Sequence, residues 1–81
     1  MTAPVVTVYT ATACPQCTAT KQHLVKLGIP FTEAAIDDQT RAAAAELGIT
    51  SAPIVCASVD GEERWWGGYR PDSIKALVSA A

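Results

Sequence analysis

The sequence predicts an α/β fold in which a mixed sheet of four strands carries three helices on its faces, in the order βαβαββα. The chain opens with two strand-helix alternations, a pattern typical of parallel strands joined by a helix. An Asp-Gly pair at positions 60 and 61 predicts a tight turn, which adds an antiparallel hairpin. The 81 residues are 49% hydrophobic and hold no Gly-, Ser- or Pro-rich tract, so we expect one domain over residues 1–81.

The first strand is expected over Val5–Tyr9, because this β-branched and aromatic run has almost no polar interruption. Such a run is typical of a central strand that is covered on both faces. The first helix is expected over Gln16–Leu27, where Pro15 suits the first helical position and Gly28 provides a natural end. The two closely spaced cysteines therefore open a helix directly after a strand.

A second strand is expected to begin at Ile29 and to run to about Ile36. The side chains of Asp37 and Asp38 can then cap an alanine-rich helix over Gln39–Leu47, which ends before a glycine. These elements complete a βαβ unit and lead into a second helix.

The remaining elements are a hairpin and a last helix. Ala52–Ala57 is predicted to be the third strand, opened by a proline that is tolerated at a strand's first residue or edge. After the turn, a short fourth strand is expected over Glu62–Trp66. Pro71 then starts a helix over Asp72–Ala80 with an apolar face.

Composition and charge exclude several functions. The net charge is -2 and the six Lys and Arg residues are scattered, so we expect no nucleic-acid partner. No Lys or Arg precedes the first apolar run, which stops at Tyr9, so we expect neither a secretory signal nor a membrane span. Three cysteines do not form a disulfide framework of the secreted type, and a reducing compartment, the cytoplasm, fits better.

The pair Cys14 and Cys17 is predicted to be redox-active. A thiol attacks a disulfide only as thiolate, and an ordinary cysteine has a pKa near 8.5. Cys14 lies where a helix begins, so its sulfur faces unpaired N–H groups and the positive end of the helix dipole. We therefore assign Cys14 as nucleophile and Cys17, one turn on, as the resolving thiol. Pro15 restrains the loop between them.

A zinc site is the simplest structural alternative for this cysteine pair. Zinc requires four ligands, usually from two cysteine knuckles or a histidine pair. Only Cys56 and His23 remain to complete such a site, and neither has metal-knuckle spacing. The sequence therefore favours redox chemistry over a metal site.

Three segments together carry a family resemblance. They are Cys14-Pro15-Gln16-Cys17 followed by Ala19-Thr20-Lys21, then Ala52-Pro53-Ile54-Val55, and Trp66-Gly67-Gly68-Tyr69-Arg70-Pro71-Asp72. Over essentially the whole chain they resemble the NrdH-redoxins, glutaredoxin-like proteins with thioredoxin-like activity. The resemblance implies a thioredoxin fold without a cofactor, a redox-active Cys14-Cys17 disulfide and electrons from NADPH by way of thioredoxin reductase. It implies the large subunit of a class Ib ribonucleotide reductase as acceptor.

The resemblance also assigns roles to further residues. It implies a cis bond between Ala52 and Pro53, where the main chain of residue 52 can pair with an extended substrate segment. In the family, the segment from Trp66 to Asp72 ties the fourth strand to the last helix and narrows the space for glutathione. Supporting or docking roles fall on Pro15, Gln16, Trp66, Gly68, Tyr69, Arg70 and Asp72.

This chain departs from the family pattern in three places. Tyr69 stands where Phe is usual, and the hairpin at residues 60–65 looks longer than typical. Cys56 is an additional thiol, expected to be a small buried residue in a core strand. Trp65 precedes Trp66 in the strand, so it should point to the opposite face.

Three other functions remain open. A glutaredoxin or mycoredoxin would be reset by glutathione or mycothiol, although Gln16 replaces the Tyr of the usual glutaredoxin motif and Ala11 provides no cation for glutathione. A carrier would hold zinc or an iron-sulfur cluster between subunits through Cys14 or Cys17. The third is a redox-inert binding module. We expect a monomer, because the two tryptophans are the only large apolar candidates for an interface.

Overall fold

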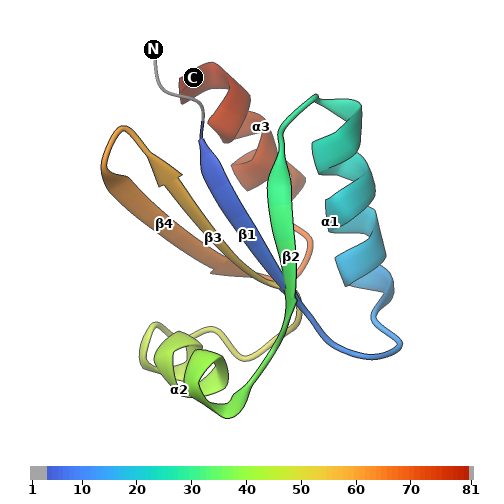
Figure 1. Ribbon diagram of the computed structural model, residues 1–81, viewed down its shortest axis with the longest axis vertical. Helices are drawn as coiled ribbons and strands as arrows, with labels where there is room; N and C mark the ends of the chain where they lie inside the picture. Colours follow the sequence, from blue (N-terminus) through green and yellow to red (C-terminus); the bar gives the residue numbers. More distant parts are fainter. Residues whose placement is uncertain (1–3, 81) are drawn as a thin grey trace.

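Four strands form one mixed sheet in the computed structural model, which describes residues 4–80 (Figure 1). β1 (Val5–Thr10) lies between β2 (Phe31–Ala35) and β3 (Ile54–Val59), and β4 (Glu62–Gly67) follows β3 at the other edge. β1 is parallel to β2 and antiparallel to β3, and β3 and β4 form an antiparallel hairpin. The predicted sheet is confirmed. Residues 1–3 and 81 of the expected domain lie outside the described part.

The three helices occupy two regions of the molecule. α1 (Pro15–Lys26) and α3 (Pro71–Ala80) lie side by side against one face of the sheet, whereas α2 (Asp38–Glu46) lies near the end where β1 finishes (Figure 1). A salt bridge of 2.9 Å between Lys21 and Glu33 ties α1 to β2. None of the helices within residues 4–80 has the length and apolar character needed to cross a membrane.

Local chemistry fixes the element boundaries. The side chain of Asp37 caps α2 by accepting a hydrogen bond of 2.7 Å from the main-chain N–H of Thr40. β3 begins at Ile54 rather than at Ala52 because the intervening proline has no N–H for the sheet. The hairpin turn has positive φ at both central residues, 51° at Asp60 and 82° at Gly61, as a two-residue turn between twisted strands requires.

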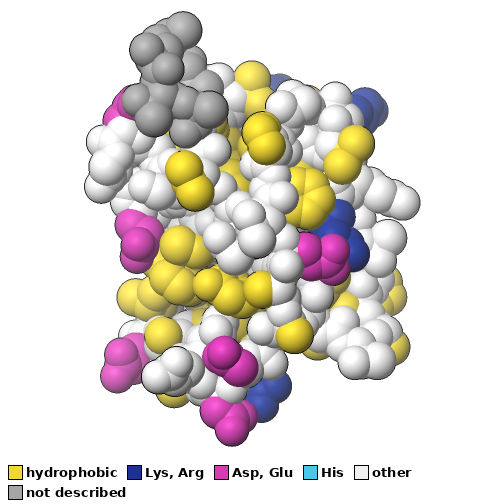
Figure 2. Space-filling model, viewed as in Figure 1, with side chains coloured by type: hydrophobic (Ala, Val, Ile, Leu, Met, Phe, Trp, Pro, Cys, Tyr) yellow, Lys and Arg dark blue, Asp and Glu magenta, His cyan; other side chains and the backbone are white. Residues whose placement is uncertain are grey.

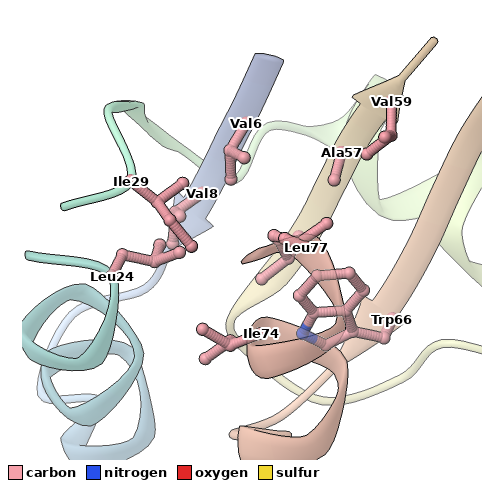
Figure 3. Packing of buried hydrophobic residues seen from close by; sticks show 10 residues of the cluster. Val6, Val8, Leu24, Ile29, Ala57, Val59, Trp66, Ile74 and Leu77 are labelled. Atoms are coloured by element: carbon pink, nitrogen blue, oxygen red, sulfur yellow. The ribbon is translucent and has the colours of Figure 1, made fainter. Parts of the chain in front are cut away.

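The hydrophobic core lies between one face of the sheet and the two helices α1 and α3 (Figure 3). Every second residue of a strand points to this face, and Leu24 of α1 and Ile74 and Leu77 of α3 pack against it without exposure to solvent. The sheet contributes Val6, Val8, Val55, Ala57, Val59 and Trp66.

The other face of the sheet is largely open, which corrects one expectation. The strand at Val5–Tyr9 was expected to be covered on both faces, but Val5 is 67% exposed while Val6 and Val8 are buried. The reason is the place of α2, which is short and lies near the end of the sheet. Hydrophobic side chains are consequently visible over the strands on the face that Figure 2 turns to the viewer.

Candidate redox site

Three loops lie at one end of the sheet. Because β3 runs antiparallel to β1 and β4, the last residues of β1, the first residues of β3 and the last residues of β4 lie at the same end of the strands (Figure 1). The loops at this end are residues 11–14 before α1, residues 51–53 before β3 and residues 68–70 before α3. The sequence-predicted site residues Cys14, Cys17 and Pro53 all lie in or beside these loops.

Cys14 and Cys17 are joined by a disulfide whose Cα atoms are 5.2 Å apart, within the range that disulfides span. Cys14 is the N-cap residue of α1, and its Sγ accepts a hydrogen bond of 3.0 Å from the main-chain N–H of Cys17. Cys14 is half-buried, whereas Cys17 is only 3% exposed. Solvent and partners thus reach the first sulfur, at the positive end of the helix dipole.

The loop before β3 lies at the same end of the sheet as this disulfide. The peptide bond between Ala52 and Pro53 is cis, the isomer that the family resemblance implied. Pro53 is buried, and its carbonyl oxygen accepts a hydrogen bond of 2.9 Å from the main-chain N–H of Gly68. This bond links the loop before β3 to the loop before α3.

A second set of hydrogen bonds links the loop before α3 to α1. The main-chain N–H of Tyr69 donates to Oε1 of Gln16 over 2.9 Å. The hydroxyl of Tyr69 lies 3.0 Å from Nδ1 of His23, and the two rings meet edge to face with centroids 5.9 Å apart. Tyr69, where the family usually has Phe, thus uses its extra hydroxyl in a contact across the helix surface.

The remaining residues with predicted supporting or docking roles differ in exposure. The side chain of Trp66 is 6% exposed and belongs to the core. Arg70 and Asp72 are exposed and form an ion pair of 3.4 Å, which holds the pKa of the Asp72 carboxyl below its usual value. Pro15 is the exposed first residue of α1.

Cys56 lies in a strand of the core sheet, as expected, but it is not fully buried. The alternation along β3 turns its side chain to the open face, where it is half-buried beside Thr7 and Trp65. Partial burial and the nearby Glu63 carboxylate raise the pKa of the Cys56 thiol.

The ligands considered for zinc are not brought together. His23 contacts Tyr69, and Cys56 lies on the open face of the sheet. Within residues 4–80, no group of three or more His, Cys, Asp or Glu side chains is placed to hold a metal ion.

Comparison with known proteins identifies the family. The family model for glutaredoxin matches residues 6–62. The glutaredoxin-like protein NrdH of Escherichia coli strain K12 is 35% identical over 77 residues, which cover 93% of this chain and 90% of that protein. The chain belongs to the NrdH-type proteins of the glutaredoxin family. The relative from Shigella flexneri matches with the same identity and coverage.

Solved structures agree with this family. The NrdH-redoxin of Escherichia coli superposes with a TM-score of 0.72 at 36% identity, covering 90% of this chain and 93% of that chain. Mitochondrial thioredoxin 3 of Saccharomyces cerevisiae superposes with a TM-score of 0.66 at 23% identity, over 96% of this chain and 78% of that one, which shows the shared thioredoxin-like fold. This glutaredoxin-family protein is thus a thiol-disulfide oxidoreductase with its Cys14-Cys17 pair at disulfide distance.

Proposed function

We propose that this redoxin carries electrons from NADPH, by way of thioredoxin reductase, to the disulfide of a class Ib ribonucleotide reductase large subunit. The observation that carries the proposal is the Cys14-Cys17 disulfide at the N-terminus of α1, in a chain that matches NrdH in sequence and fold. The solved Escherichia coli relative has a thioredoxin-like activity profile, which supports a flavoenzyme as the electron donor.

The reaction proceeds in two exchanges. In the reduced protein, the Cys14 thiolate attacks one sulfur of the acceptor disulfide, which forms a mixed disulfide and releases the other sulfur as a thiolate that takes up a proton. Cys17 loses its proton and attacks the Cys14 sulfur, which releases the second acceptor sulfur. The acceptor gains two electrons and two protons, and the Cys14-Cys17 disulfide forms. The reductase then returns two electrons from NADPH.

The exposure of each sulfur supports this division of roles. Cys14 is half-buried and available to an incoming disulfide, whereas the 3% exposure of Cys17 restricts its attack to the Cys14 sulfur of the mixed disulfide. The main chain of Ala52, next to the cis bond, would pair with the bound substrate segment. Exposed Tyr69 and Arg70 are available to a docking partner, while buried Trp66 supports the loop from the core.

The setting follows from the sequence expectations. The three-cysteine composition supports the cytoplasm as the compartment, and the net charge of -2 gives no field for nucleic acid. The protein acts as a monomer, because its two tryptophans lie on opposite faces of β4 and form no joint patch.

A second candidate function is reduction by a low-molecular-weight thiol, glutathione or mycothiol. The match of residues 6–62 to the glutaredoxin family model favours it. The two functions differ in the molecule that resets the disulfide, so they can be separated by the electron donor alone.

The test follows NADPH consumption with a disulfide substrate in two parallel reactions. One contains thioredoxin reductase, and the other contains glutathione with glutathione reductase; mycothiol with its reductase provides a third arm. Turnover with thioredoxin reductase alone supports the proposal, and turnover only with a small thiol overturns it. Cys14→Ser serves as the blank in every arm. Reduction of the purified large subunit of a class Ib ribonucleotide reductase then tests the proposed acceptor.

A further inference from the structure

Gln16 lies between the two cysteines, and its side-chain amide has one fixed orientation. The main-chain N–H of Tyr69 meets the end of this amide at 2.9 Å. A main-chain N–H can only donate, so the atom that it meets must be the acceptor oxygen and not the nitrogen. The NH₂ group of Gln16 is therefore turned away from Tyr69.

The neighbouring glycine supports this arrangement. Gly68 has φ of +78°, and a Cβ atom at this position would lie 3.0 Å from Oε1 of Gln16. Its N–H donates to the carbonyl oxygen of Pro53 over 2.9 Å. The segment that anchors Gln16 is thus itself fixed to the loop that bears the cis bond.

The donor end of the Gln16 amide is free. The residue is exposed, and within the described residues 4–80 no oxygen accepts a hydrogen bond from its Nε2. Both N–H groups thus belong to an exposed side chain, on the residue that lies one position before Cys17 and two after Cys14. Since the oxygen is anchored, these donors have already lost much of their rotational freedom, which reduces the entropy cost of using them.

We propose that Gln16 is a substrate-recognition residue, whose NH₂ group donates a hydrogen bond to a main-chain carbonyl oxygen of the polypeptide that presents its disulfide to Cys14. A main-chain carbonyl is present at every position of a protein substrate and absent from a small dialkyl disulfide. The donor therefore discriminates protein disulfides from small ones. This role rests on the proposed function in one respect, namely that the substrate is a protein disulfide.

The test compares two substrates in single-turnover reactions, with fully reduced protein and no reductase present. One substrate is a cyclic peptide closed by a disulfide, and the other is hydroxyethyl disulfide. Gln16→Glu keeps an acceptor oxygen for Tyr69 but replaces the donor by a second oxygen. We expect its rate constant for the peptide to fall about three- to ten-fold, the usual effect of one hydrogen bond, and the rate constant for hydroxyethyl disulfide to fall less.

Two further variants separate recognition from other causes. Gln16→Met loses donor and acceptor together, so its rate constant for the peptide should fall by the same factor, and its Tm should also be lower. Thr12→Glu adds the same charge in the exposed loop before Cys14 without touching Gln16, and it should retain the substrate preference of the wild type. A peptide rate constant for Gln16→Glu equal to the wild-type value overturns the role. Equal losses on both substrates, or an equal defect in Thr12→Glu, also overturn it.

The outcome for the wild type distinguishes this role from the proposed function. If thioredoxin reductase fails to reduce the wild type, the proposed electron donor is wrong, but the single-turnover comparison still tests Gln16. If the reduced wild type fails to reduce the peptide disulfide, the proposed function itself is wrong, and the recognition role is overturned with it.

Discussion

The main-chain N–H of Cys17 donates a hydrogen bond to the Sγ atom of Cys14 over 3.0 Å. The same donor is in place to stabilise a Cys14 thiolate after reduction, at a helix N-terminus that already favours negative charge. The two cysteines thus differ. Cys14 is half-buried and its sulfur accepts a hydrogen bond, whereas Cys17 is buried.

This inequality predicts opposite phenotypes for two serine variants. Cys14→Ser should abolish disulfide reduction, because no accessible thiolate remains. Cys17→Ser should retain the first exchange and accumulate a mixed disulfide with the acceptor, because no second thiol resolves it. Non-reducing electrophoresis and mass spectrometry of the trapped species provide the measurement. Trapping by Cys14→Ser in place of Cys17→Ser would reverse the assignment.

The stability of the fold should depend strongly on Leu24, which is 0% exposed between α1 and the sheet. Leu24→Ala is expected to lower the free energy of unfolding by about 2–5 kcal/mol, because it leaves a cavity in the core. Val25, the next residue of the same helix, is 68% exposed, so Val25→Ala should change the free energy of unfolding by less than about 0.5 kcal/mol. Urea denaturation followed by circular dichroism compares the pair. Similar losses in both variants would contradict this packing.

The cap of α2 should make part of the stability depend on acid. Hydrogen bonding to Thr40, chiefly from its main-chain N–H and also from its side chain, holds the pKa of the Asp37 carboxyl below its usual value. The ionised Asp37 carboxylate therefore adds to the free energy of unfolding above the pKa of the unfolded state, about pH 4. This contribution is lost as the pH falls through the lower pKa of the folded state. Asp37→Asn keeps a good cap, so its stability should resemble the wild type at pH 7 and decline less in acid.

Asp37→Ala provides the comparison, because it removes the cap at every pH. Thermal unfolding monitored from pH 7 to pH 2 distinguishes the three proteins. If wild type and Asp37→Asn lose stability in parallel, the carboxylate of Asp37 does not contribute to the acid dependence.

Cys56 should react slowly with alkylating reagents. In the oxidised protein it is the one free thiol among residues 4–80, and its pKa is raised by burial and by Glu63. Less thiolate is therefore present at pH 7 than for a free cysteine, and iodoacetamide should modify Cys56 more slowly than N-acetylcysteine. Mass spectrometry measures both rates. Glu63→Gln should speed the reaction, and an unchanged rate would exclude the influence of this carboxylate.

The sheet and the disulfide could be predicted because they depend on local signals. Strand-helix alternation, Pro15 at a helix start and the Asp60-Gly61 turn each specify a short segment, and two cysteines three residues apart at the start of a helix lie close together. The exposure of Val5 and the incomplete burial of Cys56 could not be predicted, because they depend on how much of the sheet α2 covers.

The contacts of the loop before α3 could not be predicted from the sequence either. The bond from Tyr69 to Gln16 joins residues 53 positions apart, and the contact with His23 spans 46 positions. No periodic pattern encodes such pairs. The single available signal was Tyr in the place of Phe, since a hydroxyl at that position requires a polar neighbour if it is to be satisfied.

The two consecutive tryptophans of β4 give the molecule two separate optical probes. Trp66 is packed in the core beside α3, whereas Trp65 lies on the opposite face, where its indole N–H donates to Glu63 over 2.6 Å. A collisional quencher in solution therefore reaches the emission of Trp65 first, and loosening of the core shifts the emission of Trp66. A ligand that settles on the open face and one that disturbs the core would thus leave different spectral signatures, without any added label.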